Sequence, residues 1–202
     1  MRRYFSLFIL AVCFLAGCKE KKKSERRLVY NEDFKWTISI PAGFDTLSKD
    51  KWSVMQGRGE KVLEETHGVE IENNAKTIFV FQSDQFNYFE SNHQPFDSTE
   101  DGDFSESFHA LNDMLYSTFE SQMPKAKLDS SSSVQTISGL QFNVFKVRIE
   151  ISAKMVLNWQ MFSRLFGKEE FTVNIMTADK EKERELLDSW LNSKFDKPLP
   201  SK

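Results

Sequence analysis

Cysteine is almost absent from this chain of 202 residues. The two cysteines are Cys13 and Cys18, and both lie within the first eighteen residues. The rest of the chain therefore has no thiol for a disulfide, a thiolate metal site or a nucleophile. Its folded core must be held together by packed side chains alone, and the 19 phenylalanines provide large apolar groups for that purpose.

The sequence also lacks the short motifs that identify many enzymes. It contains no Gly-x-Ser-x-Gly elbow, phosphate-binding glycine loop or dinucleotide fingerprint. His67, His93 and His109 have none of the spacings typical of zinc ligands. His109 and Asp113 share a predicted helix face, and this i, i+4 pair is interpreted as a surface hydrogen bond rather than a catalytic dyad. No cofactor and no metal are expected, and a non-catalytic role is favoured.

An apolar run extends from Tyr4 to Ala16. It is too short to span a membrane, because a spanning helix needs roughly 20 residues. It follows two arginines and ends in Leu15-Ala16-Gly17-Cys18, the layout of a bacterial lipoprotein signal with its lipobox. We expect residues 1–17 to be removed and Cys18 to carry acyl chains such as palmitate. This predicts a membrane partner and a place in the cell envelope, at the outer membrane in preference to the inner. The alternative is a chance cysteine in an ordinary signal peptide or in a core segment.

Charge is distributed unevenly along the predicted mature chain. Residues 19–27 carry six basic and two acidic side chains, whereas residues 28–202 carry 19 basic and 28 acidic ones. We interpret 18–27 as a lipidated cysteine with a basic tether, and 28–202 as one domain. The tether is either attracted to anionic lipid head groups or merely solvated. The acidic domain argues against nucleic acid as a partner, because phosphate binding needs a basic face.

Hydrophobic periodicity predicts an ordered series of strands and helices. Strands are expected at 34–40, 77–81, 86–90, 141–151, 155–166 and 171–176. Helices are expected after the capping residues Ser48, Asp103 and Asp179. The segment Asp129 to Ser133 is expected to be a loop, and the last helix to bury Leu186, Leu187, Trp190 and Leu191. This order is typical of an α+β domain with an antiparallel sheet and helices packed on it.

Several packing motifs resemble those of the PsbP-like fold. They are the segments Trp36–Phe44, Gln122–Pro124, Ile137–Phe142 and Phe171–Ile175, and the helix that contains Trp190. The resemblance implies an α/β/α sandwich that serves as an accessory or binding module, with no shared catalytic motif. The segments Asp84–Glu90 and Phe96–Asp103 are also similar to those of envelope lipoproteins of Bacteroidetes-type bacteria.

One polar sheet face is the first candidate binding site. In the strands from 141 to 166, apolar residues alternate with polar ones, so the polar side chains share a face. That face holds Lys146, Arg148, Glu150, Asn158, Gln160 and Arg164. Because a covered sheet should be apolar here, the face either lines a groove or is simply solvated. We predict binding through Arg148, Asn158, Gln160 and Arg164.

The acidic segment Asp97 to Asp103 is a second candidate, because oxygen ligands around Gly102 are similar to a calcium loop. The pattern is incomplete. Position three is Thr99 rather than Asp or Asn, and position twelve is Phe108 where a bidentate Glu is required. We interpret this segment as a solvated acidic loop in which Asp103 caps a helix.

These observations favour a lipid-anchored accessory or binding module whose partner is an envelope protein or a small ligand. The alternative is an envelope hydrolase that uses carboxylates on the polar sheet face. A hydrolase should present two converging titratable groups with perturbed pKa values, which a binding module does not need.

Overall fold

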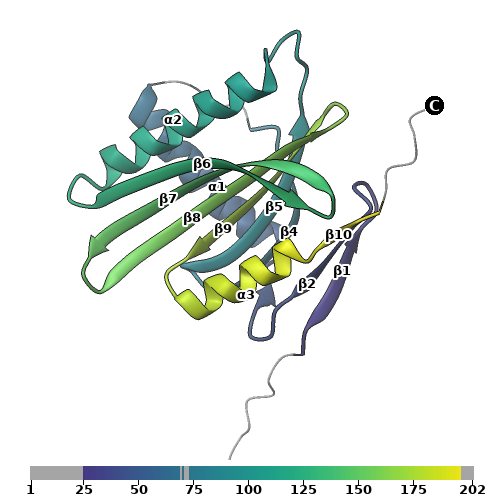
Figure 1. Cartoon of the computed structure of the whole chain (residues 1–202). Helices are drawn as coiled ribbons and strands as arrows, with labels where there is room; N and C mark the ends of the chain where they lie inside the picture. Colours follow the sequence, from purple (N-terminus) through teal and green to yellow (C-terminus); the bar gives the residue numbers. More distant parts are fainter. Residues whose placement is uncertain (1–24, 69, 71–72, 197–202) are drawn as a thin grey trace, which may run out of the picture.

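Seven antiparallel strands form the central sheet of the computed structural model, which describes residues 25–68, 70 and 73–196 (Figure 1). In spatial order they are β3 (Asp45–Thr46), β4 (Lys76–Asp84), β5 (Asn87–Pro95), β9 (Glu169–Thr177), β8 (Met155–Phe166), β7 (Leu140–Ser152) and β6 (Lys127–Ile137). The chain reaches β9 only after β6, β7 and β8, so the β4–β5 hairpin and the meander from β6 to β9 join through the β5–β9 pair.

Helices cover both faces of this sheet. Helices α1 (Lys49–His67) and α2 (Phe104–Gln122) lie on one face, and α3 (Lys180–Leu191) lies on the other, in front of the sheet in Figure 1. A small sheet of β1 (Arg27–Asn31), β2 (Trp36–Ile40) and β10 (Lys194–Phe195) packs beside α3. The predicted α+β architecture, a sheet between two layers of helices, is confirmed.

Trp190 is the centre of the aromatic cluster between the sheet, α3 and the small sheet. It is fully buried, with its ring centroid 5.2 Å from that of Phe142 and 5.8 Å from that of Trp36. The prediction that Trp190 is buried is therefore confirmed. Leu191 was expected to be buried as well, but it is 40% exposed. Successive side chains of an α-helix are offset by about 100° around the helix axis, so the side chain after Trp190 points away from the core.

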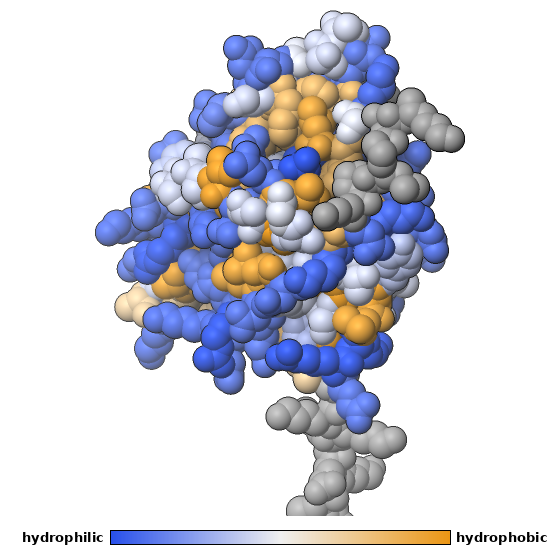
Figure 2. Space-filling model, turned by 45° about the vertical axis from the view of Figure 1, so that its right-hand side comes forward, coloured by the Kyte–Doolittle hydropathy of each residue, from blue (hydrophilic) through white to orange (hydrophobic). Residues whose placement is uncertain are grey.

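A second cluster lies under α2. Phe145, Val147 and Ile149 of β7 and the facing residues of β8 pack against Phe108 and the apolar stripe of α2. Because these strand residues alternate with Lys146 and Arg148, β7 has the two different faces that its sequence predicts. On the surface, hydrophilic side chains predominate and hydrophobic ones form patches between them (Figure 2).

The three predicted helix starts are confirmed. Ser48, Asp103 and Asp179 are the N-caps of α1, α2 and α3, and each side chain accepts hydrogen bonds from backbone N–H groups of the first turn. These bonds satisfy N–H groups that have no partner within the helix.

The predicted loop from Asp129 to Ser133 is wrong, because these residues belong to strand β6. All eleven residues of β6 pair with β7, although most of their side chains are exposed. An edge strand needs ladder hydrogen bonds from one neighbour only, and polar residues there prevent pairing with other chains. Its run of serines therefore shows no alternation by which the strand could be recognised.

The short strands β1, β3 and β10 were not predicted from the sequence. Strand β1 begins at Arg27, the last residue of the predicted tether, and pairs with β2 from Arg27 to Asn31. In the part of the chain that the structure describes, no helix has the length and apolar character needed to cross a membrane.

Candidate functional site

Polar side chains of the meander and of α3 line a pocket of about 280 Å³, which we name the meander pocket. Strands β6, β7 and β8 form its floor, and one flank of α3 forms a wall. It is lined by Asp129, Ser130, Ser131, Lys146, Val147, Arg148, Asn158, Trp159, Gln160, Glu183 and Leu187.

Three of the four predicted binding residues lie together in this pocket. Arg148 and Asn158 are register partners on β7 and β8, and Gln160 lies two residues further along β8. That they bind a ligand stays a prediction.

Arg164 does not line the meander pocket. It is four residues beyond Gln160, about 13 Å along the strand. Its Nη1 donates to the carbonyl oxygen of Gln141 at 2.9 Å, and its guanidinium carbon lies 5.2 Å from the ring centroid of Phe166. Partial burial lowers the pKa of the Arg164 guanidinium. Strand alternation therefore placed Arg164 on the correct face, but at a different position along that face.

The carboxylate of Glu183 in α3 accepts hydrogen bonds from two amide side chains of the pocket. Asn158 Nδ2 donates to its Oε2 at 3.1 Å, and Gln160 Nε2 donates to its Oε1 at 2.9 Å. Gln160 is only 5% exposed, and its remaining amide atom, Oε1, has no hydrogen-bond partner in the described part of the chain. A buried acceptor without a partner costs about 1–3 kcal/mol. A ligand that donates a hydrogen bond to this oxygen would remove that cost.

The cations of the pocket come from β7. Arg148 Nη1 donates to Glu150 Oε2 at 2.8 Å, and this contact lowers the pKa of the Glu150 carboxyl. Lys146 is the register partner of Gln160, and within the described residues it forms no ion pair at 4 Å or less. The pocket therefore combines an unpaired cation with an unpaired hydrogen-bond acceptor.

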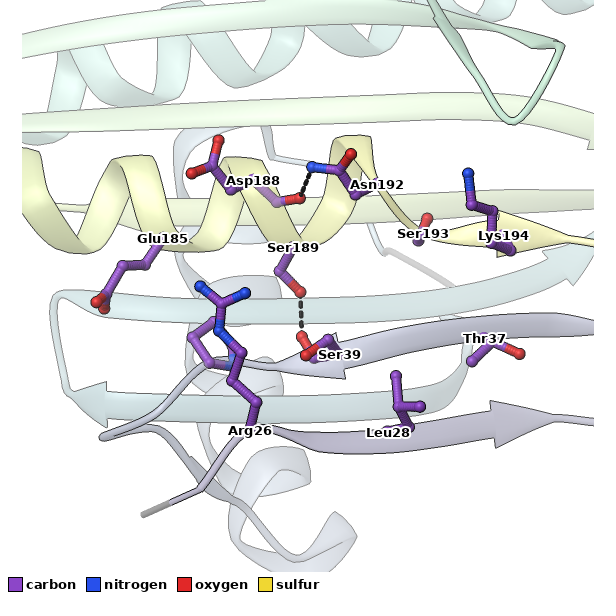
Figure 3. Close-up of a pocket in the computed structure, with 11 residues that line it drawn as sticks. Arg26, Leu28, Thr37, Ser39, Glu185, Asp188, Ser189, Asn192, Ser193 and Lys194 are labelled. Carbon is purple, nitrogen blue, oxygen red and sulfur yellow. Dashed lines mark hydrogen bonds between the residues drawn. The ribbon is translucent and has the colours of Figure 1, made fainter. Parts of the chain in front are cut away.

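A second pocket, of about 380 Å³, lies on the other flank of α3, between this helix and strands β1 and β2 (Figure 3). We name it the N-terminal pocket. It is lined by Arg26, Leu28, Thr37, Ser39, Pro41, Glu185, Asp188, Ser189, Asn192, Ser193 and Lys194. Ser189 Oγ donates to the carbonyl oxygen of Ser39 and so connects α3 to β2 across 150 residues of sequence. This pocket was not predicted from the sequence, because strand β1, which forms one side of it, was not predicted.

Glu90 is buried on the sheet face that α1 and α2 cover. Its carboxylate accepts from Asn92 Nδ2 at 2.7 Å and from Asn174 Nδ2 at 2.8 Å. Burial raises the pKa of Glu90 to about 7 despite these bonds, and burial also raises the pKa of its neighbour Tyr88 to about 12. Glu90 was not predicted from the sequence as a candidate, since a polar residue that alternates with Phe89 and Ser91 is typical of a solvent-facing position.

The carboxylates of the Asp97–Asp103 loop bind groups of the loop itself. Asp101 Oδ2 accepts from the backbone N–H of Asp97, Asp97 Oδ1 accepts from Thr99, and Asp103 caps α2. Among the described residues, no group of three or more His, Cys, Asp or Glu side chains could hold a metal ion.

The histidines of the described domain contact different neighbours. His67 Nε2 lies 2.8 Å from Thr118 Oγ1, and His93 Nδ1 lies 2.8 Å from Glu169 Oε2. The ring of His109 lies beside that of Phe108, at 6.0 Å between centroids. The contact of His67 connects α1 to α2 and that of His93 connects β5 to β9, which is a structural use of these two rings.

Comparison with known proteins informs the fold alone. No protein-family model matches the sequence, and no curated protein is significantly similar to it. The solution structure of cyanobacterial PsbP (CyanoP) from Synechocystis sp. PCC 6803 superposes with a TM-score of 0.52 at 8% identity, over 90% of this chain and 99% of that one. The chain has a PsbP-like fold. A shared fold at this identity assigns no function.

Two further structures are less similar to this PsbP-like chain. A protein from Bacteroides thetaiotaomicron VPI-5482 has a TM-score of 0.46 at 9% identity, over 87% of this chain and 50% of that one. The Ran-binding protein Mog1p of Saccharomyces cerevisiae has a TM-score of 0.36 at 10% identity, over 84% and 85%. Scores this low carry no functional information about the chain.

Cys18 lies outside the described residues, as do the signal segment and most of the tether. The lipid anchor, the boundaries at 17 and 27, and the envelope location therefore stay predictions from the sequence.

Proposed function

We propose that this protein is a lipid-anchored binding module of the cell envelope, without catalytic activity, whose ligand occupies the meander pocket. The unpartnered Oε1 of the buried Gln160 is the observation that carries the proposal. It supports a ligand site because a buried acceptor gains most from a partner that a ligand can supply. The sequence of residues 1–18 supports the anchor, since two or three acyl chains hold a protein durably at a membrane.

The chemistry of the pocket favours a small polar ligand with an anionic group. Lys146 offers a cation without an ion pair, and Gln160 offers an acceptor for a hydroxyl or amide donor. Ser131 of β6, the register partner of Lys146, adds a short hydroxyl group. An anionic sugar contains both an anionic group for Lys146 and hydroxyl donors for Gln160. An acidic side chain of an envelope protein contains only the anionic group.

An envelope hydrolase remains the alternative function, and the raised pKa of Glu90 is the observation in its favour. Glu90 lies on the opposite face of the sheet from the meander pocket. The buried Glu170 shares its face, but the register partners of β5 place Glu90 beside Asn174, four residues or about 13 Å from Glu170. Paired carboxylates in glycoside hydrolases are about 5–9.5 Å apart. This geometry favours the binding module.

A thermal-shift titration tests the pocket, because a ligand that binds only the folded state raises the unfolding midpoint. The probes are glucuronate, galacturonate and the neutral sugar glucose, and the protein is residues 18–202 with Cys18→Ser. We name this protein the soluble chain; it contains every residue of both hydrophobic clusters. A uronate should raise the midpoint, and the shift should be lost in Gln160→Leu and Lys146→Ala but kept in Arg164→Ala. Equal shifts in all variants, or none with any probe, would contradict the proposal.

A further inference from the structure

The N-terminal pocket combines charged groups of both signs. Arg26 and Lys194 are basic, whereas Glu185 and Asp188 are acidic and lie three residues apart on α3. Among the described residues, none of these four side chains forms an ion pair at 4 Å or less. Like charges at i, i+3 repel each other, so a cation near these carboxylates would be stabilising. Groups of both signs around one hollow are complementary to a zwitterion.

Figure 3 shows the charged side chains at different positions along the pocket. Arg26 extends from the beginning of β1 toward α3, in the direction of Glu185, while Lys194 lies at the far end, next to Ser193. The volume of about 380 Å³ is within the usual range of small-molecule sites, about 300–1,000 Å³. Two ends of a short ligand can therefore contact different charged groups.

Ser193 adds a polar group without a partner. Its side chain is only 3% exposed, it lines the pocket, and its Oγ has no hydrogen-bond partner in the described part of the chain. A hydroxyl can donate to an anionic or hydroxyl oxygen of a ligand, and an arginine can bind a phosphate through two parallel N–H bonds. The pocket thus offers donors for a phosphate as well as acceptors for an ammonium group.

The N-terminal pocket lies close in sequence to the predicted lipid anchor, which would bring it near a membrane surface. Arg26 is eight residues after Cys18, a distance of at most about 29 Å for an extended chain. Next to it, Leu28 lines the pocket and is 75% exposed, and Tyr30 on the same strand is 44% exposed. An exposed aromatic ring with nearby basic residues is typical of surfaces that contact lipid head groups.

We propose that the N-terminal pocket binds a phosphoethanolamine group, with the phosphate at Arg26 and the ammonium group at the carboxylates of α3. This chemistry is that of a zwitterionic phospholipid head group, and soluble phosphoethanolamine compounds share it. The lipid as its source rests on the proposed anchor at Cys18, whereas the site itself does not.

Calorimetric titration of the soluble chain tests the site. The probes are O-phosphoethanolamine, inorganic phosphate, ethanolamine and phosphocholine. Phosphoethanolamine should bind about tenfold more tightly than any of the other three, since each lacks one charge or the ammonium N–H donors. Arg26→Ala and Asp188→Asn should each weaken this binding about tenfold. No binding of phosphoethanolamine, or equal binding by these variants, would overturn the proposal.

Two control variants distinguish this site from its surroundings. Arg184→Ala removes an exposed cation of α3 outside the pocket and should leave phosphoethanolamine binding unchanged. Gln160→Leu should also leave it unchanged, because Gln160 lines the meander pocket. Loss of binding in either control would contradict the assignment to the N-terminal pocket. Thermal midpoints of all variants show that each remains folded.

Vesicle sedimentation distinguishes the two sources of the ligand. The soluble chain should sediment with vesicles of phosphatidylethanolamine mixed into phosphatidylcholine, and less with phosphatidylcholine alone. Equal sedimentation, together with binding of free phosphoethanolamine, would support the site and overturn the lipid as its source. Since the soluble chain has no acyl group, a negative result here leaves the anchor at Cys18 unaffected.

Discussion

The ionisable side chain of Glu90 is almost completely buried. Between its ordinary pKa of 4.5 and the value of about 7 in the folded protein, the folded state holds a proton that the unfolded state has lost. The free energy of unfolding therefore falls as the pH rises through this window. Below the window, the contribution of the protonated Glu90 to stability is fully present. Asn174 Oδ1 has no partner among the described residues, so a rotated Asn174 amide can accept from a protonated Glu90.

Glu90→Gln should remove this pH dependence, because a neutral amide fills the same space. At pH 8 the variant should be more stable than the parent by about 2–3 kcal/mol, and at pH 4 the advantage should be absent. Urea unfolding of the soluble chain at both pH values measures the difference. An equal effect of the substitution at pH 4 and pH 8 would show that Glu90 titrates normally.

Trp190→Ala should destabilise the fold by about 3–5 kcal/mol, since it removes the fully buried ring at the centre of the aromatic cluster. The matched control is Leu191→Ala, whose exposed side chain should change stability by less than about 0.5 kcal/mol. Urea unfolding measures both. A loss below about 1 kcal/mol for Trp190→Ala would mean that the cluster does not depend on this ring.

Among the elements, the β6–β7 hairpin depends on its two-residue turn. Ser138 and Gly139 have φ values of 52° and 81°, and Ile137 pairs directly with Leu140. Two consecutive residues with positive φ match the twist of the strands that they connect. A side chain at the second position adds strain, because L-residues other than asparagine and aspartate rarely adopt it.

Gly139→Ala should therefore destabilise the soluble chain by about 1–2 kcal/mol, although no atom would lie within 4 Å of the added Cβ. Gly57→Ala is the matched control. Its Cβ would also be free of contacts, but Gly57 lies inside α1 with ordinary helical φ, so the change should stabilise by about 1 kcal/mol. Thermal unfolding of both variants gives the signs. The same sign for both would contradict the account of the turn.

The elements differ in how far the sequence determines them. Helices α2 and α3 have a capping aspartate followed by an apolar stripe, so local residues identify them. Strand β6 has no such signal, because its serines form a strand only by pairing with β7. Strand β10 has two residues and depends on β2 in the same way. Local patterns predict elements with their own signal, and long-range pairing determines the others.

The same distinction applies to the site. Alternation along β7 and β8 predicts that Arg148, Asn158 and Gln160 share a face, and these residues do line one pocket. The bonds from Glu183 could not be predicted, because they depend on where α3 packs on the sheet. The N-terminal pocket likewise depends on contacts between the two ends of the described chain.

For the whole molecule, α3 separates two pockets of different chemistry. The meander pocket lies on the sheet, and the N-terminal pocket lies next to the predicted tether. In the proposed arrangement, the first holds an envelope ligand while the second contacts the membrane that anchors the protein. In this proposal, the function as a membrane-bound module requires acylation of Cys18.

Labelling of the full chain with a palmitate analogue, followed by membrane fractionation, tests this requirement most directly. The parent protein should incorporate the label and sediment with the membranes, because acyl chains contribute about 0.8 kcal/mol for each buried CH₂ group. The Cys18→Ser variant should incorporate no label and lose most of its membrane association. Cys13→Ser should remain labelled, since Cys13 lies in the predicted signal peptide. Undiminished sedimentation of Cys18→Ser, or labelling that persists in it, would contradict the lipid anchor.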